Sequence, residues 1–319
     1  MQKDKKTLLI TGGSGFLGRN LGLFFKDKYN VVLGSRNNKL NFLAGKLTGC
    51  AVAPIDVSNI ESVRDAVNEF KPHIIIHAAA TKFVDLSEKF PMECVDVNVV
   101  GSQNVARVAA DKGVETVLGI STDKAAPPIR NVYGMSKAVM ERVFCSMNGK
   151  TGTKFACVRY GNVAWSTGSV LPDWKQMWEK TQVIGTTGPE MRRFFFTVEE
   201  AVGLVNTALE NIDDIQGKVL SREMKSAQIE DILKVWVANK GGKYEKISGR
   251  PGERNDEFLV GEIELPYTVE KNYNGIKHFI ISFNQKADKP LPEIFSSANA
   301  KRLTDEEILK LITNIPENV

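Results

Sequence analysis

The sequence is poor in the residues that cross-link proteins or bind metals. It holds three histidines and four cysteines, and no two cysteines form a CxxC pair. Scattered cysteines argue against a disulfide framework and against a zinc site, and so few histidines argue against a metal centre built on histidine. We therefore expect no bound metal and a reducing compartment. The cysteines are Cys50, Cys94, Cys145 and Cys157.

Long apolar runs and a strong charge of one sign are also missing. No run approaches the roughly 18 apolar residues of a membrane-spanning helix, and the polar residues 1–6 lead directly into residues 7–10 without a signal-type segment. Forty-two Lys and Arg against 38 Asp and Glu leave a net charge of +4, with no basic run interleaved with aromatic residues. We therefore expect a cytoplasmic protein whose partners include neither a membrane nor a nucleic acid.

The first half of the chain alternates short apolar runs with segments of helical spacing. The runs are continuously apolar, as strands are when helices cover both faces of a sheet. Strand–helix–strand units with short connections predict right-handed crossovers and a parallel sheet. The predicted fold class is therefore α/β, with a Rossmann-type doubly wound parallel sheet. Strands are expected at 7–10, 31–33, 51–55, 74–76 and 116–120, and helices at 18–26, 60–70 and 95–112.

This regularity decreases after about residue 164, where polar loops and steps rich in Gly and Pro begin. A length of 319 residues is compatible with two domains. We predict a dinucleotide-binding domain over residues 1–163 and a smaller α/β substrate domain over residues 164–319. An apolar run near residues 216–222 predicts a strand that returns to the first sheet, so that the two domains are interleaved.

A glycine-rich loop follows the first predicted strand and opens the first predicted helix. Its sequence, Thr-Gly-Gly-Ser-Gly-Phe-Leu-Gly over residues 11–18, fits both GxGxxG and GxxGxxG. Glycines allow a tight turn and a close approach of the backbone to a pyrophosphate, and the helix N-terminus offers free N–H groups to the anion. In this strand–loop–helix context the motif predicts a dinucleotide site. The expected contacts are Gly12, Ser14, Gly15, Phe16, Leu17 and Gly18.

The end of the second strand indicates which dinucleotide binds. An acidic residue there would bind the ribose hydroxyls of NAD, but the chain has Ser35 and Arg36. Arg36 suits a 2′-phosphate through charge-assisted hydrogen bonds, which favours NADP. The alternative is a solvated Arg36 with NAD as the cofactor. Asp56, after the third strand, is compatible with contact to the adenine amino group and equally with a place at the start of the next helix.

A tyrosine and a lysine follow the fifth strand at YxxxK spacing. Tyr133 and Lys137 are four residues apart, so on a helix they share one face. A free tyrosine has a pKa near 10, and a lysine cation nearby is expected to lower the pKa of Tyr133 by roughly 1–3 units. This would make Tyr133 an acid–base group for a sugar hydroxyl. An ordinary surface helix pair is the alternative.

Together these features resemble the extended short-chain dehydrogenase/reductase superfamily. The resemblance rests on the glycine loop, an Asp after the third strand, an Ala-rich turn after the fourth and the YxxxK pair. It adds further expected cofactor contacts and implies that Lys137 holds the nicotinamide ribose. It also implies a homo-oligomer that pairs through the helices at 95–112 and 133–147. The added contacts are Asp56, Val57, Ala78, Ala79 and Ala80, with Tyr133 and Lys137 themselves.

The segment 121–126, Ser-Thr-Asp-Lys-Ala-Ala, points to one reaction. Asp123 followed by Lys124 puts a proton donor and a potential base beside a tyrosine and a nicotinamide, which suits an elimination. Oxidation of a sugar at carbon 4 acidifies the proton on carbon 5. A base removes that proton, an acid protonates the carbon-6 hydroxyl, water leaves, and the hydride returns to carbon 6. A solvated loop pair is the alternative for these two residues.

The same segment resembles the UDP-N-acetylglucosamine 4,6-dehydratases of polysaccharide and nonulosonic-acid pathways. That resemblance implies that Asp123 is the acid, that Lys124 is the base at carbon 5, and that Thr122 hydrogen-bonds the carbon-4 oxygen. It implies that Asn162, Arg193 and Arg250 hold the nucleotide diphosphate, although surface cations are the alternative for both arginines. The implied substrate contacts are Lys82, Asn162, Arg193, Arg250 and Glu253.

The chain departs from that family at several positions near the expected sugar nucleotide. Inverting members usually have Lys-His-Val-Pro where residues 82–85 are Lys-Phe-Val-Asp, and Thr167 and Asp256 replace a usual Arg and a frequent His. These changes leave the nucleotide base, uridine or guanosine, and the stereochemistry at carbon 5 open. A 4-epimerase or 4-keto reductase on the same fold is a second hypothesis. A non-catalytic NADP-binding regulator is a third.

Overall fold

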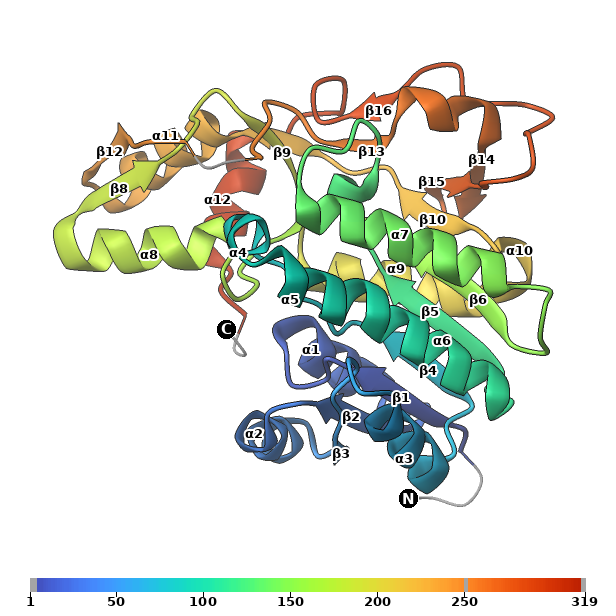
Figure 1. The fold of residues 1–319 in the computed structure, drawn as a ribbon. Coiled ribbons are helices and arrows are strands. Elements are labelled where there is room, and N and C mark those ends of the chain that lie inside the picture. Colours follow the sequence, from blue (N-terminus) through green and yellow to red (C-terminus); the bar gives the residue numbers. More distant parts are fainter. Residues whose placement is uncertain (1–4, 250–251, 317–319) are drawn as a thin grey trace.

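The computed structural model describes residues 5–249 and 252–316. A nine-stranded sheet in the order β14-β15-β10-β6-β5-β4-β1-β2-β3 runs through the middle of the protein (Figure 1). Neighbouring strands are parallel from β3 to β10, whereas β15 and β14 are antiparallel to their neighbours. This confirms the predicted fold class. The strands are β1 (Thr7–Thr11), β2 (Asn30–Ser35), β3 (Ala51–Pro54), β4 (Ile74–His77), β5 (Thr116–Ile120), β6 (Lys154–Val158), β10 (Val219–Arg222), β14 (Thr268–Tyr273) and β15 (Ile276–Ile281).

Helices cover both faces of this sheet. In β1, Leu8 and Ile10 point into a core on one side, while Leu9 points into a separate core on the other. Burial of each such aliphatic side chain contributes roughly 1.5–3 kcal/mol to the free energy of folding. Because side chains of one strand point to both faces, the same short strands stabilise both helical layers. The first core packs against α1 (Phe16–Phe25) and α9 (Val198–Glu210), and the second packs against α3 (Ile60–Phe70), α6 (Gly101–Asp111) and α7 (Val132–Met147).

A third core lies beside the carboxyl ends of the parallel strands. Trp165, Trp174 and Trp236 are buried there, and the ring of Trp236 contacts the rings of the other two. Aromatic side chains of this size provide a large apolar area in a small volume, which stabilises a region built from short elements. The helices are α8 (Val170–Thr181), α11 (Ile229–Lys240) and α12 (Asp305–Thr313). The strands around it are β7 (Asn162–Val163), β8 (Val183–Thr186), β9 (Arg192–Phe196), β11 (Ser226–Gln228) and β12 (Lys243–Lys246). Strands β13 (Phe258–Val260) and β16 (Phe295–Ser296) pair with each other, and their apolar side chains pack into the first two cores.

Most expected elements are present, with differences at three places. The predicted helix at 95–112 is divided into α5 (Pro91–Val95), a π-helical turn over Asp96–Val100, and α6. Helix α2 (Asn38–Thr48) and the antiparallel strands β14 and β15 were not expected. The strand expected near 216–222 is β10, which pairs in parallel with β6. The assignment of residues 164–319 to a separate domain remains a prediction.

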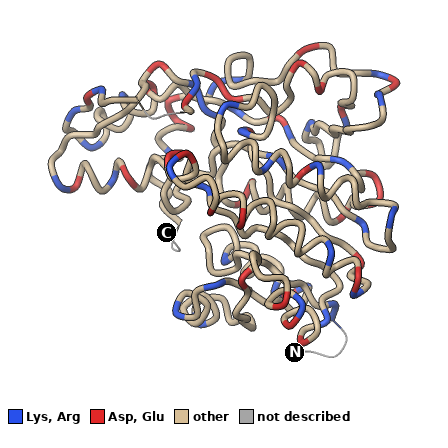
Figure 2. Tube along the Cα trace, in the orientation of Figure 1, with Lys and Arg blue, Asp and Glu red and all other residues tan. Residues whose placement is uncertain are grey.

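Charges of both signs are distributed over the whole trace. Lys and Arg alternate with Asp and Glu along most of the chain (Figure 2). Electrostatic effects on chemistry therefore depend on local clusters of side chains rather than on the net charge. Within residues 5–249 and 252–316, no helix combines the length and the apolar character that crossing a bilayer requires.

Candidate active site

A cleft of about 710 Å³ lies at the carboxyl ends of the parallel strands. It begins at the turn after β1, passes the turns after β4 and β5, and ends against α8 and β8. The strand order reverses between β1 and β4, and ligands of open α/β sheets bind at such a switch point. The cleft is therefore the candidate active site.

The glycine loop forms one end of this cleft from backbone alone. Gly12 has φ +70°, and a Cβ added there would lie 2.7 Å from the backbone nitrogen of Ala79. A Cβ added at Gly18 would lie 2.5 Å from the carbonyl oxygen of Gly12. Helix α1 then starts with Gly15 as its N-cap, which makes no side-chain capping bond, so its first N–H groups remain open to an anion. This cradle fits the pyrophosphate of a dinucleotide.

The predicted cofactor residues fall into two groups. Ser35 and Arg36 line the cleft beside the loop, and the Ser14 hydroxyl donates to the Ser35 hydroxyl at 2.7 Å. Asp56 and Val57 are not among the cleft-lining residues of the described chain. The Asp56 carboxylate instead accepts from the backbone and side chain of Ser58. The remaining predicted contacts line the cleft: Gly12, Ser14, Gly15, Phe16, Leu17, Gly18, Ala78, Ala79, Ala80, Tyr133 and Lys137.

The YxxxK pair lies on the first turns of α7 and faces the cleft. Asn131 caps this helix by accepting from the Gly134 N–H at 2.7 Å, which fixes where the pair sits. The expected effect of Lys137 on Tyr133 is wrong for this structure. Burial raises the pKa of Tyr133 to about 12, and the cation that opposes this rise is Lys124. Lys137 donates to the Met140 sulfur at 3.1 Å, and burial lowers its own pKa to about 8.

Asp123 and Lys124 lie in a short 3₁₀ turn directly after β5, capped by Thr122. The Asp123 side chain is 0% exposed, and its Oδ1 accepts from the Thr122 hydroxyl at 2.9 Å and from Lys124 Nζ at 3.1 Å. Its other oxygen, Oδ2, has no hydrogen-bond partner within the described chain. Oδ2 lies close beneath the cleft-lining Gly161, where an added Cβ would be only 3.1 Å away. Thr122 and Lys124 line the cleft, whereas Asp123 is not among its lining residues in the described chain and lies behind the wall. A buried carboxyl with one unpartnered oxygen at that place suits a proton donor.

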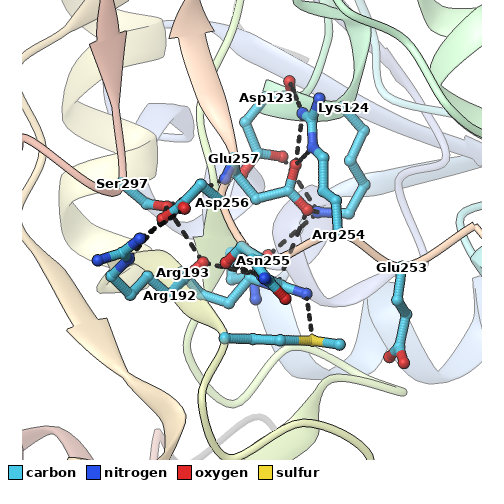
Figure 3. Close-up of polar contacts among 12 residues, drawn as sticks. Asp123, Lys124, Arg192, Arg193, Glu253, Arg254, Asn255, Asp256, Glu257 and Ser297 are labelled. Carbon is cyan, nitrogen blue, oxygen red and sulfur yellow. Dashed lines mark hydrogen bonds and ion pairs between the residues drawn. The ribbon is translucent and has the colours of Figure 1, made fainter. Parts of the chain in front are cut away.

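Two residues that the sequence analysis missed complete this cluster. Glu257 is buried, and its Oε2 accepts from Arg254 Nε at 2.5 Å while its Oε1 lies 3.5 Å from Lys124 Nζ. Arg254 also donates to the backbone carbonyl of Asp123 at 3.2 Å. Figure 3 shows these four side chains turned toward one another, with Glu253 pointing away. The only sequence signal was an acidic residue shortly after an Arg-Pro-Gly-Glu turn.

The residues expected to bind the substrate differ in their burial and in their hydrogen bonds. Asn162 accepts from Lys124 Nζ at 3.4 Å, and Glu253 accepts from the Thr187 hydroxyl at 3.0 Å. Arg193 is buried and bonds the backbone carbonyls of Arg192 and Asn255. Lys82 is exposed on the cleft wall. Arg250 lies outside the described residues.

Comparisons with known proteins agree with this geometry. A family model described as polysaccharide biosynthesis protein matches residues 8–277. A UDP-glucose 4-epimerase of Rickettsia bellii is 31% identical, with 97% of this chain and 96% of that protein covered. A UDP-N-acetylglucosamine 4,6-dehydratase (inverting) of Campylobacter jejuni is 31% identical over 86% and 83% of the two chains. The X-ray structure of Pen from Bacillus thuringiensis superposes with a TM-score of 0.89 at 28% identity, covering 99% of both chains.

Proposed function

Because the chain belongs to the polysaccharide biosynthesis protein family of extended short-chain dehydrogenases/reductases, we propose that it is a nucleotide-sugar 4,6-dehydratase. The proposed substrate is UDP-N-acetylglucosamine and the proposed product is its 4-keto-6-deoxy sugar. The proposed cofactor is NADP, which when bound supplies the hydride acceptor and donor for carbons 4 and 6. The backbone of residues 12–18 would hold its pyrophosphate, Arg36 its 2′-phosphate, and Lys137 its nicotinamide ribose.

The observation that carries this proposal is the direct contact between Asp123 and Lys124. In the proposed elimination Lys124 takes the proton from carbon 5, Asp123 gives a proton to the carbon-6 oxygen, and water leaves. Lys124 must be neutral to act as a base, yet its pKa is raised: burial lowers it, but Asp123 and Glu257 outweigh burial. A proton that moves from Lys124 Nζ to Asp123 Oδ1 across 3.1 Å resolves this, since it creates the base and the acid together.

The remaining residues would act on carbon 4. Tyr133 would exchange a proton with the carbon-4 hydroxyl, and Thr122, which hydrogen-bonds Tyr133, would hold the same oxygen. The high pKa of Tyr133 suits it to hold a proton, so removal of a proton by this residue requires a further positive charge beside the phenol. A bound cofactor in its oxidised form would supply such a charge through its nicotinamide ring.

Two alternatives remain within the same family. A 4-epimerase is favoured by the match to the Rickettsia bellii protein over nearly the whole chain. An epimerase needs no acid for a departing water, so it gives no reason for a buried Asp123 in contact with Lys124. GDP-N-acetylglucosamine is the alternative substrate, since residues 82–85, Thr167 and Asp256 depart from the usual pattern of the inverting dehydratases.

The test is product analysis in deuterated water. The purified protein is incubated with UDP-N-acetylglucosamine, or with GDP-N-acetylglucosamine in parallel, and the product is followed by proton NMR. A 4-keto-6-deoxy sugar with deuterium at carbon 5 is expected, and its coupling constants report whether carbon 5 is inverted. A product changed only in configuration at carbon 4 would instead establish the epimerase. No reaction with either nucleotide, despite bound cofactor, would contradict the proposed substrate class.

The homo-oligomer remains a proposal, supported by exposed apolar side chains on the helices expected to pair. Val95 and Val100 in the first of these segments are 38% and 36% exposed, and Met135 and Val139 on α7 are 51% and 42% exposed. Light scattering of the purified protein measures its mass directly. A Met135→Glu/Val139→Glu variant is expected to shift the mass toward that of the monomer, whereas a wild-type protein with the mass of a single chain would contradict the proposal.

A further inference from the structure

Glu257 is a buried carboxylate placed directly behind the proposed acid–base pair. Its Oε1 lies 3.5 Å from Lys124 Nζ and 3.8 Å from Arg193 Nε, and its Oε2 lies 2.5 Å from Arg254. Lys124 thus lies between two carboxylates, with Asp123 at 3.1 Å on the other side. A buried charge with three cationic neighbours remains ionised, and it acts strongly on nearby groups because little water screens it.

The chain holds Glu257 rigidly in this place. Its backbone N–H donates to the Ser297 hydroxyl at 3.0 Å, and its carbonyl accepts from the Ser297 N–H at 2.8 Å. Arg254 grips the carboxylate and at the same time donates to the carbonyls of Pro128 and Asp123. The distance from Glu257 to the 3₁₀ turn that carries the pair is therefore set by several hydrogen bonds.

We propose that Glu257 is a positioning residue whose ionised carboxylate holds Lys124 against Asp123 and confines the acidic proton to Asp123. The inference rests on the proposed function, because it assigns the roles within the same acid–base pair. Two carboxyl groups near one ammonium group compete for protons. When their surroundings differ, one remains ionised and the other becomes the acid. Glu257, gripped by Arg254, is the ionised member, and Asp123, with its Oδ2 unpartnered in the described chain, is the acid.

The charged neighbours shift the two carboxyl groups in opposite directions. Burial raises the pKa of Asp123, and the negative charge of Glu257 raises it further, against Lys124 and Arg254; the pKa ends above its ordinary value. Burial also raises the pKa of Glu257, but Lys124, Arg193 and Arg254 outweigh it, and this pKa ends below its ordinary value.

Removal of this negative charge has a defined effect on the pair. Asp123 and Lys124 titrate together, and the active form carries one proton fewer than the fully protonated pair. Glu257 favours the more protonated forms, so its neutralisation lowers both pKa values of the pair. Arg254 and Tyr133 also act on this pair, and Arg193 lowers the pKa of Lys124. The substitution leaves the charges of these residues in place and removes only the carboxylate that faces Arg193 and Arg254, which lowers both pKa values of the pair further. The whole pH–rate profile should therefore move toward lower pH.

The experiment compares Glu257→Gln with Asp256→Asn as a matched control. Both variants remove one negative charge, but Asp256 pairs with Arg192 instead of Lys124. Because Asp256 also accepts from the Ser297 hydroxyl that bonds the Glu257 backbone, the control measures at the same time what a change in that contact does to the pair. Dehydration is measured against pH with UDP-N-acetylglucosamine. For Glu257→Gln both limbs of the profile are expected to move to lower pH by about 1 unit or more, whereas Asp256→Asn keeps the wild-type midpoints. A lower rate with unmoved midpoints would mean a merely structural role and would overturn the inference.

A second measurement needs no substrate. The carboxyl carbon of Asp123 is followed against pH by NMR in protein labelled at aspartate, with Asp123→Asn to assign the signal. The midpoint of this titration is expected to fall in Glu257→Gln and to stay at the wild-type value in Asp256→Asn. An equal midpoint in wild type and Glu257→Gln overturns the inference.

If Glu257→Gln does not fold, a second variant replaces it. Glu257→Asp has a shorter side chain, which moves the carboxylate away from Lys124, and should show a smaller shift in the same direction. Wild type that fails to dehydrate any nucleotide sugar contradicts the proposed function alone, because the NMR midpoint still tests Glu257.

Discussion

The two ends of the cleft differ in whether backbone or charged side chains form them. At the proposed cofactor end, residues 11–18 contain no ionisable side chain, and the shape comes from backbone that approaches other backbone at glycines. At the proposed substrate end, four mostly or fully buried side chains form a chain of ion pairs, from Asp123 to Lys124, from Lys124 to Glu257 and from Glu257 to Arg254. The shape of the first end depends on the absence of side chains at its glycines. The protonation of the second end depends on the balance among its charged side chains.

This difference determines how each end should respond to change. Loss of one partner from a buried ion pair costs about 3–5 kcal/mol, because the remaining charges lose their compensation. Overpacking at a glycine costs about 1–3 kcal/mol and is independent of pH. The substrate end should therefore be sensitive to the removal of a charge, and the cofactor end to added volume and to the charging of a group that is buried there in its neutral form.

The largest effect is expected from Asp123→Asn, which removes the proposed acid but keeps the shape of the side chain. Dehydration should fall about 10²–10⁴-fold, the contribution of a positioned acid or base, while oxidation at carbon 4 continues. Reduced nicotinamide, measured by its absorbance, should then accumulate. Asp213→Asn, at a side chain that is 77% exposed, is the matched control and should behave as wild type. An equal loss of oxidation and dehydration in Asp123→Asn would contradict the separation of roles.

A pH effect on stability is expected next, from His77 at the cofactor end. His77 is fully buried between the Thr11 and Ser102 hydroxyls, and burial, helped by Lys137, lowers its pKa to about 3 from 6.5. The unfolded chain binds the proton near pH 6.5 and the folded chain only near pH 3. The free energy of unfolding should therefore fall as the pH drops through this window, by up to about 4–5 kcal/mol.

Urea denaturation between pH 7 and pH 4 measures this slope. In His77→Gln the part of the slope that belongs to this residue should disappear. The same pH dependence in the variant and in wild type would show that another group carries it, and would weaken the contrast between a neutral cofactor end and a charged substrate end.

A smaller effect is expected from Gly18→Ala, which tests volume at the cofactor end. Its new Cβ would meet the Gly12 carbonyl at 2.5 Å, so NADP binding, measured by calorimetry, should weaken about tenfold or more. Gly203→Ala is the matched control, because nothing lies within 4 Å of a Cβ added there on helix α9. It should keep cofactor binding and raise the free energy of unfolding by up to about 1 kcal/mol. Equal affinities for all three proteins would argue against the loop as the pyrophosphate site.

The smallest effect is expected from Arg36→Ala, because this side chain is exposed. If Arg36 binds a 2′-phosphate, the preference for NADP over NAD should fall about tenfold, the value of one charge-assisted hydrogen bond. Lys39→Ala, on the exposed side of α2, should leave the ratio unchanged. The result decides whether the cofactor end uses a charge at all, and an unchanged ratio in Arg36→Ala would favour NAD.

The sequence indicated which residues line the glycine-loop end of the cleft better than which residues surround Lys124, for a physical reason. The glycine loop occupies consecutive residues, and YxxxK needs one helical turn, so local spacing determines both. The arrangement of Glu257 and Arg254 around Lys124 needs the residues just before β13 to return to a turn about two-fifths of the chain earlier. The effect of Lys137 on Tyr133 was predicted wrongly because spacing places two residues on one face but does not say how deeply they are buried.

By itself the sequence determined the alternation of strands and helices, the parallel sheet and the position of the glycine loop, because each depends on hydrophobic period and on glycine within a few residues. Only the tertiary structure decided that two antiparallel strands extend the sheet and that a second buried carboxylate stands behind the Asp123–Lys124 pair. Burial and ion pairing depend on residues distant in the chain. The protonation of the side chains at this cleft is therefore set by contacts between distant parts of the chain, whereas the order of strands and helices follows from the local sequence.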